Sequence, residues 1–177
     1  MTASAPLRRI IVRGSRSDAA RGVLVAGPLT APCALGRSGV TRQKREGDGA
    51  TPAGTLRLVA GYWRADRVAR PCTAVPMSSL RPSDGWCDDP ADRRYNRPVR
   101  LPYPGGHEDM WRQDHLYDIV VVLDWNLARP RPGGGSAIFF HLAAPGLGPT
   151  AGCIAVTLPA MRRLLTLSGP ETVFDVG

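Results

Sequence analysis

Residues 136–156 read SAIFFHLAAPGLGPTAGCIAV, and this stretch decides both the fold and the candidate site. The apolar run that ends at His141 predicts one buried β-strand, and the apolar residues after Cys153 predict a second. Gly152 has no Cβ, so it allows a tight turn in which the amides of Gly152 and Cys153 can point toward one spot. A strand that delivers a histidine beside such a cysteine provides what a thiolate nucleophile needs, because imidazole can take the thiol proton.

Two interpretations of this pattern follow from the residues. In the first, Cys153 is a nucleophile, His141 is its base, and the Gly152 amide contributes to an oxyanion hole. In the second, Cys153 is a structural thiol and His141 merely ends a strand, since free cysteine is among the most buried residue types. A cysteine and a histidine in sequence prove no contact in space, so both interpretations stand at this point.

Two motifs in this chain together resemble those of the YkuD family of L,D-transpeptidases. Four residues match the family's cysteine motif, namely Thr150, Gly152, Cys153 and Ile154. Residues 47–56, GDGATPAGTL, are similar to the family's glycine-rich segment followed by Thr-Pro-x-Gly and a strand. The motifs occur in the family's order. The resemblance implies a cysteine acyltransferase without a cofactor, built as a β-sandwich or open barrel of mixed sheets.

The chain departs from the family pattern close to the cysteine. Ala151 stands where the family usually has a second histidine, Ala155 stands where arginine is common, and the loop from His141 to Cys153 is short. Leu142 follows the first histidine, and the resemblance implies that its main-chain carbonyl orients the imidazole, which any residue can do. These differences imply a divergent branch with an atypical acyl donor, resembling proteobacterial enzymes that link L-alanine to diaminopimelate.

Length and composition predict one mainly β domain over residues 1–177. With 43% hydrophobic residues, the chain can bury a sizeable core without metals or disulfides. Strand-like runs lie at residues 9–12, 22–26, 32–35, 55–60, 99–101, 117–123, 136–141, 153–156 and 172–176. One helix is predicted after Val156, with Thr157 as N-cap and Gly169 as its stop. Its apolar face would consist of Leu158, Met161, Leu164 and Leu165.

Residues 62–114 show weak periodicity and are rich in arginine, proline, aspartate and aromatic residues, which predicts a long loop insertion that caps the site. Anchoring of the loop is the alternative role for its aromatic residues. The substrate-binding residues expected from this insertion and from the cysteine turn are Tyr95, Asn96, Arg97, Trp111, Arg112, Thr150 and Ala151. His107 and Glu108 resemble a fragment of a zinc motif, but the second histidine is missing at helical spacing, so no metal site is predicted.

The chain is basic, with 23 Lys and Arg against 15 Asp and Glu and a formal net charge of +8. Nucleic-acid binding is not predicted, because the arginines are dispersed and no nucleic-acid module is recognisable. Basic groups that we expect to attract the carboxylates of peptidoglycan peptide stems are Arg37, Arg42, Lys44 and Arg45. Among the other cysteines, Cys33 reads as part of a buried strand, whereas Cys72 and Cys87 either form a disulfide or stay free.

Residues 1–20 contain four arginines and no uninterrupted apolar segment, so neither a signal peptide nor a membrane span is predicted. A cross-linking enzyme nevertheless acts outside the inner membrane. We therefore expect a periplasmic monomer, with a cytoplasmic enzyme as the alternative. Three functions stay open, namely a transpeptidase that transfers a stem to a diaminopimelate amine, an L,D-carboxypeptidase that uses water during cell-wall recycling, and a non-catalytic basic domain that binds the cell wall.

Overall fold

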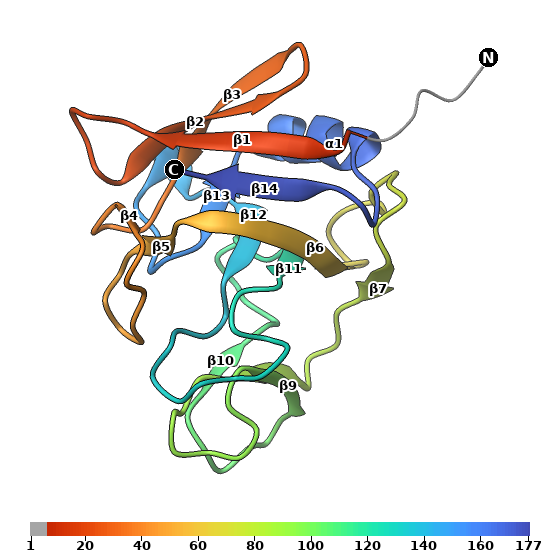
Figure 1. The fold of residues 1–177 in the computed structure, drawn as a ribbon. Coiled ribbons are helices and arrows are strands. Elements are labelled where there is room, and N and C mark those ends of the chain that lie inside the picture. The colour runs from red at the N-terminus through yellow and green to blue at the C-terminus, as the bar shows by residue number, and fades with distance from the viewer. Residues whose placement is uncertain (1–6) are drawn as a thin grey trace.

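The computed structural model describes residues 7–177, and Figure 1 shows its fold. The first six residues of the segment considered for a signal peptide lie outside the described residues. The strands are β1 (Arg9–Gly14), β2 (Arg21–Ala26), β3 (Leu29–Ala34), β4 (Val40–Thr41), β5 (Thr51–Pro52), β6 (Gly54–Trp63), β7 (Met77–Ser79), β8 (Asp84–Cys87), β9 (Arg97–Arg100), β10 (His107–Asp109), β11 (Ile119–Leu123), β12 (Phe139–Leu142), β13 (Ile154–Val156) and β14 (Val173–Val176). A 3-10 helix, η1 (Pro145–Leu147), and an α-helix, α1 (Leu158–Leu167), complete the elements.

Nine strands form one mixed sheet in the order β11-β12-β13-β3-β2-β1-β14-β6-β7. Strand β11 also pairs with β6, so the sheet closes on itself as a barrel (Figure 1). The pairs β1–β14, β12–β13 and β6–β7 are parallel, and the other neighbours are antiparallel. The predicted mainly β fold with mixed strand directions is therefore confirmed. The resemblance implied a β-sandwich or an open barrel, and the β11–β6 pairing makes the barrel a closed one.

Alternation along the strands separates two apolar clusters, because successive side chains of a strand point to opposite faces. In β12, Phe140 belongs to the cluster that also buries α1, whereas Phe139 belongs to a second cluster beneath the insertion. Cys153 belongs to the second cluster as well. His141, two residues after Phe139, therefore shares the face that carries the cysteine.

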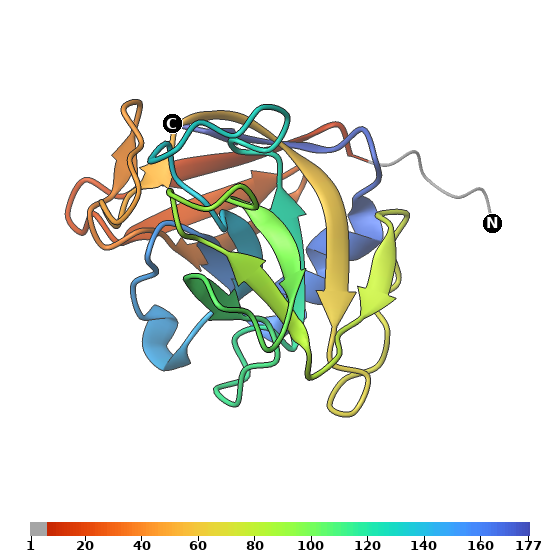
Figure 2. The ribbon, with the colours of Figure 1, turned by 90° about the horizontal axis from the view of Figure 1, so that it is seen from below.

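The insertion between β6 and β11 contains more regular structure than the predicted loop. Strands β8, β9 and β10 form a small antiparallel sheet in the order β10-β8-β9. This sheet lies below the barrel in Figure 1 and in front of it in Figure 2. The sequence did not indicate β8 and β10, because strands of three or four residues that contain glycine and acidic residues show no usable periodicity. Trp86 of β8 and Met110, which directly follows β10, belong to the second cluster.

Helix α1 has the predicted apolar face, with Met161, Leu164 and Leu165 buried. Thr157 occupies the predicted N-cap position with an extended backbone, although its side chain makes no capping hydrogen bond. The helix ends at Leu167, where the Ser168 hydroxyl donates to the carbonyl of Leu164 at 2.7 Å.

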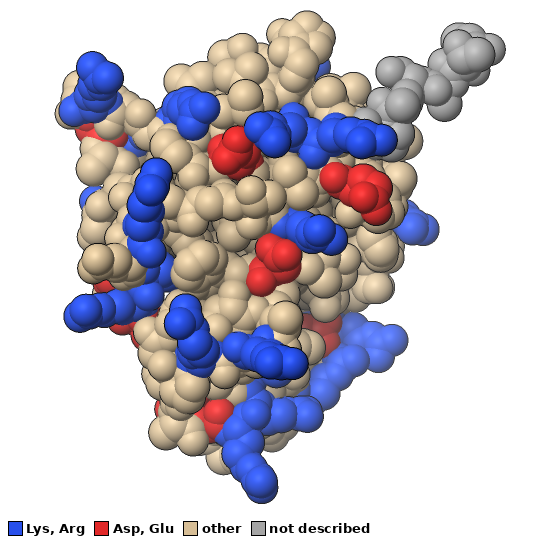
Figure 3. All heavy atoms as spheres, viewed as in Figure 1, with Lys and Arg blue, Asp and Glu red and all other residues tan. Residues whose placement is uncertain are grey.

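Cys33 lies buried in β3, as predicted, and burial raises the pKa of its thiol to about 12. Among residues 7–177 all four cysteines are free, with Cys72 exposed and Cys87 buried. No helix in this part of the chain is both long enough and apolar enough to cross a membrane. On the face shown in Figure 3, lysine and arginine side chains are spread out with acidic side chains between them.

Candidate active site

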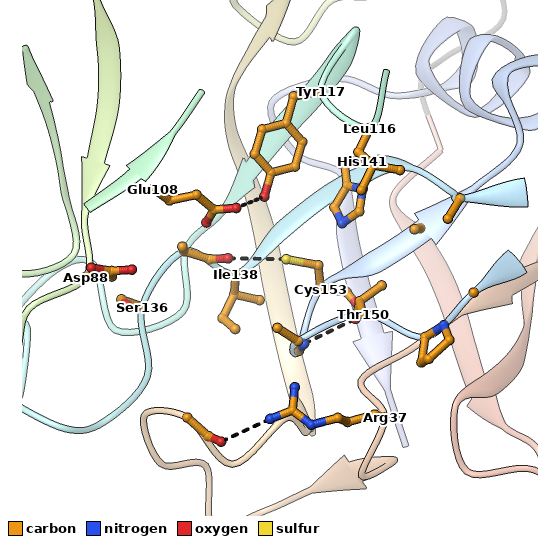
Figure 4. Close-up of a pocket in the computed structure, with 18 of the residues that line it drawn as sticks. Arg37, Asp88, Glu108, Leu116, Tyr117, Ser136, Ile138, His141, Thr150 and Cys153 are labelled. Carbon is orange, nitrogen blue, oxygen red and sulfur yellow. Dashed lines mark hydrogen bonds between the residues drawn. The ribbon is translucent and has the colours of Figure 1, made fainter. Parts of the chain in front are cut away.

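Parallel pairing of β12 with β13 brings His141 and Cys153 to one place. His141 lies opposite Ala155 in the register, and Cys153 immediately precedes β13. The backbone amide of Phe139 donates to the Cys153 sulfur at 3.3 Å, so the cysteine is also tied to β12. Both side chains are buried at a cavity of about 350 Å³, and Figure 4 shows them side by side in its wall.

The imidazole of His141 is fixed in its orientation by the next residue. Its Nδ1 lies 2.8 Å from the carbonyl oxygen of Leu142, and a carbonyl only accepts, so Nδ1 carries the hydrogen and Nε2 keeps its lone pair. The Tyr117 ring packs edge-on against the imidazole, with 5.2 Å between the ring centroids. Burial lowers the pKa of His141 to about 4, although the Leu142 bond favours the charged form. The imidazole is therefore neutral near pH 7.

The thiol of Cys153 points to the main chain just before β12. Its Sγ donates to the Ala137 carbonyl at 3.2 Å, as Figure 4 shows, and no hydrogen bond joins it to the imidazole within residues 7–177. Burial raises the pKa of Cys153 to about 12, and the negative charge of Glu108 acts in the same direction. The amide of Phe139 works against this rise. The resting pair is thus a neutral thiol beside a neutral imidazole.

The turn before Cys153 requires glycine. Gly152 has φ +143°, and a Cβ there would lie 2.8 Å from the carbonyl oxygen of Ala50. Its amide donates to the Thr150 hydroxyl at 3.1 Å, and that hydroxyl donates to the Cys153 carbonyl at 2.8 Å. The amide expected to serve an oxyanion hole is thus engaged within the turn, and the Thr150 hydroxyl, expected to bind substrate, has main-chain partners.

The second sequence motif stabilises this turn through hydrogen bonds. Thr51, in β5, accepts a hydrogen bond from the Gly36 amide at 2.8 Å and donates to the Cys153 carbonyl at 3.3 Å. Thr150 also pairs with Gly36 as an isolated β-bridge. The two motifs therefore meet in space, and the Thr51 hydroxyl links them.

We expect Thr51→Val to lower the free energy of unfolding by about 1–3 kcal/mol, because the Gly36 amide loses its acceptor while the side-chain shape is kept. Urea unfolding measures the change. Thr55→Val is the matched control, since Thr55 is exposed in β6, and it should change stability by less than about 0.5 kcal/mol. Equal effects at the two positions would contradict the supporting role of Thr51.

Six of the predicted site residues line the cavity, namely His141, Cys153, Gly152, Thr150, Ala151 and Arg112. Ala151 is exposed at this cavity, so it is not a small residue packed beneath the turn. The carbonyl of Leu142 reaches the imidazole from outside the cavity lining. No cluster of three or more histidine, cysteine or acidic side chains suited to a metal ion occurs in residues 7–177.

The other four predicted binding residues lie outside the cavity and anchor the insertion, which corrects the expectation that they line the groove. The Asn96 side chain accepts from the indole of Trp86 at 3.0 Å and donates to two main-chain carbonyls. The Tyr95 hydroxyl donates to the carboxylate of Glu46. Arg97 donates to a main-chain carbonyl at 2.7 Å, and the Arg64 guanidinium lies 3.5 Å from the ring centroid of Trp111. Their polar and aromatic groups make contacts within the protein. These contacts agree with the alternative role, in which such residues anchor the loop.

Three of the five cavity residues that the insertion contributes form one network. The Tyr117 hydroxyl donates to the Glu108 carboxylate, and an Arg112 nitrogen lies 3.4 Å from the same carboxylate. Burial raises the pKa values of both Glu108 and Tyr117. Only Arg112 was predicted, because Tyr117 read as a strand residue and Glu108 as part of an incomplete zinc motif.

Two of the four basic residues expected to attract acidic substrates line the cavity, namely Arg37 and Lys44. Arg37 is exposed and donates to the Gly47 carbonyl at 3.3 Å (Figure 4). Lys44 is buried, and its Nζ lies 2.5 Å from the Asp48 carboxylate. Arg42 and Arg45 do not line the cavity.

A comparison with family models matches residues 15–176 to YkuD, the L,D-transpeptidase catalytic domain. The matched region runs from the end of β1 to the last strand and includes both motifs and the insertion between them. A comparison with curated proteins finds no match.

Proposed function

Since the chain belongs to the YkuD family of L,D-transpeptidase catalytic domains, we propose that it is a peptidoglycan L,D-transpeptidase with Cys153 as its nucleophile. The observation that carries the proposal is the parallel β12–β13 pairing, which places a buried thiol and an oriented imidazole in one cavity. We propose that residues 1–177 form one catalytic domain that acts as a monomer. We place it in the periplasm because cross-linking takes place outside the inner membrane.

The first half of the proposed reaction forms a thioester. The Cys153 thiol turns from Ala137 by rotation about its Cα–Cβ bond and gives its proton to Nε2 of His141. The sulfur then attacks the carbonyl carbon of an L-centre in the donor stem, so that a carbon–sulfur bond forms. The carbon–nitrogen bond breaks as the imidazolium protonates the leaving amine of the D-residue. His141 is again neutral at the end of this half.

The second half transfers the acyl group to an amine. The side-chain amine of a diaminopimelate residue attacks the thioester carbon and gives a proton to His141, and the departing sulfur takes that proton back as a thiol. In both halves we assign the Gly152 amide to the oxyanion, which would replace the Thr150 hydroxyl as acceptor of its hydrogen bond. The Leu142 carbonyl keeps Nε2 unprotonated and available.

The cavity lining around Ala151 favours an atypical acyl donor. Ala151 is exposed and lines the cavity, so no large side chain narrows the cavity at this position. Arg37 and Arg112 lie in the same cavity and would pair with stem carboxylates. We therefore propose that the enzyme accepts a donor other than the usual tetrapeptide, with L-alanine to diaminopimelate links as the specific product.

Incubation with defined muropeptides, followed by mass spectrometry, tests the function. We expect cross-linked dimers, and tandem mass spectra should place the new amide bond at L-alanine rather than at the third residue of the stem. Shortened monomers without dimers would show that water is the acceptor and would assign L,D-carboxypeptidase activity instead. The absence of both products with a folded protein would contradict both enzymatic functions and leave a wall-binding role.

A further inference from the structure

Lys44 is a buried cation beside the candidate nucleophile. Its side chain is 2% exposed, whereas lysine is almost never buried in proteins unless it is paired. Its partner Asp48 is itself fixed, because its carboxylate accepts from the amides of Arg45 at 2.7 Å and Ala50 at 2.9 Å. The loop before β5 therefore holds the ammonium in one position at the cost of burying a charge.

The side chain of Lys44 is directed at the cysteine turn. Its stem crosses Gly135 so closely that a Cβ on this glycine would lie 2.9 Å from Cγ of Lys44. Its end reaches Gly152, where a Cβ would lie 3.3 Å from Nζ. Lys44 also lines the cavity that contains the thiol of Cys153. The absence of side chains at the two glycines lets the ammonium approach Gly152, the residue before the nucleophile.

Few other positive charges in the cavity are available to stabilise a negative charge at Cys153. Arg112 is shared with the carboxylates of Glu108 and Asp114. The imidazole of His141 is neutral because burial lowers its pKa to about 4. The remaining titratable and charged groups that line the cavity are Arg37, Glu46, Asp88 and Tyr117. Burial and Glu108 raise the pKa of the Cys153 thiol, whereas Lys44 acts to lower it.

We propose that the Lys44 ammonium stabilises the negative charge that forms at Cys153, first on the thiolate and then on the tetrahedral oxyanion. Asp48 then determines how much of this positive charge reaches the cysteine, because it neutralises part of it through the 2.5 Å contact. The oxyanion half of the inference rests on the proposed transpeptidase function, but the thiolate half is measurable without any substrate.

The test compares alkylation of Cys153 by iodoacetamide in Lys44→Met, Lys44→Arg and Asp48→Asn proteins at fixed pH between about 7 and 9. Only the thiolate reacts, so the rate follows the thiolate fraction. We expect roughly tenfold slower alkylation in Lys44→Met, because the thiolate loses a nearby positive charge. Lys44→Arg keeps the charge and should stay within about threefold of the parent protein, while Asp48→Asn should react severalfold faster.

Peptide mass spectrometry reads each cysteine separately, so exposed Cys72 provides an internal reference in every sample. Opposite changes in Lys44→Met and Asp48→Asn support the inference. Slower alkylation in both variants would mean that the ion pair merely shapes the turn, and would overturn it. Thermal unfolding checks each variant, and if Lys44→Met does not fold, the absence of acceleration in folded Asp48→Asn overturns the inference by itself.

The muropeptide assay separates this inference from the proposed function. If the parent protein forms neither dimers nor shortened monomers while the alkylation rates change as expected, the enzymatic function fails and the charge effect of Lys44 stands. If the parent protein forms cross-links while Lys44→Met and Asp48→Asn alkylate at the parent rate, the function stands and the inference fails.

Discussion

Cys153→Ala is expected to abolish the formation of cross-linked products and to leave the protein folded. Loss of a nucleophile that forms a covalent intermediate lowers kcat by about a millionfold, so turnover should fall below detection. The fold should survive because alanine removes a single buried atom and leaves the strand pairing of β12 and β13 in place. Mass spectrometry of muropeptides measures the products, and circular dichroism verifies the fold.

Cys33→Ala is the matched control for this experiment. Cys33 is fully buried, and burial raises its pKa to about 12, as it does for Cys153. The two thiols differ in their surroundings, since Cys33 lies in the barrel core and Cys153 lies at the cavity with His141. Cys33→Ala should therefore keep its activity. A folded Cys153→Ala protein with full activity would exclude the thioester mechanism.

The barrel strands were predictable because their local sequence is consistent with their place in the fold. Strand β11 is apolar throughout and buried on both faces, and β12 is buried along its whole length, including His141. The insertion was not predictable in the same way. Its short strands are specified by pairing partners such as Cys87 with His107, and these pairings carry no local apolar pattern.

The site shows the same division. His141, Cys153 and Gly152 lie close in sequence, so one local motif revealed them. Lys44 and Glu108 reach the cavity from segments that are distant in sequence. Lys44 can do so because two glycines along its path have no Cβ, and Glu108 is held there by the hydroxyl of Tyr117. From residue type alone, Lys44 was interpreted only as a basic group that attracts substrate, and Glu108 only as part of a metal motif.

His141→Asn is expected to lower kcat/KM by about a thousandfold or more, because general acid–base groups contribute about 10²–10⁴ to the rate and asparagine cannot accept the thiol proton. His115→Asn is the matched control. His115 is exposed and has φ +67°, a conformation that asparagine tolerates. Steady-state rates with muropeptides measure both variants, and an unchanged rate in His141→Asn would remove His141 from its role as base.

The pH dependence of the parent enzyme provides a second test of His141. The base must be neutral to accept a proton, and burial lowers the pKa of this imidazole to about 4. As pH falls, kcat/KM should therefore stay constant through about 6.5, the ordinary histidine pKa, and decline only near pH 4. The same shift reduces stability as pH falls from about 6.5 to about 4, since the unfolded chain binds the proton first. Circular dichroism must accompany the rates for this reason. An acid limb near pH 6.5 in protein that remains folded would mean that the catalytic base is a solvated group and not the buried imidazole held by Leu142.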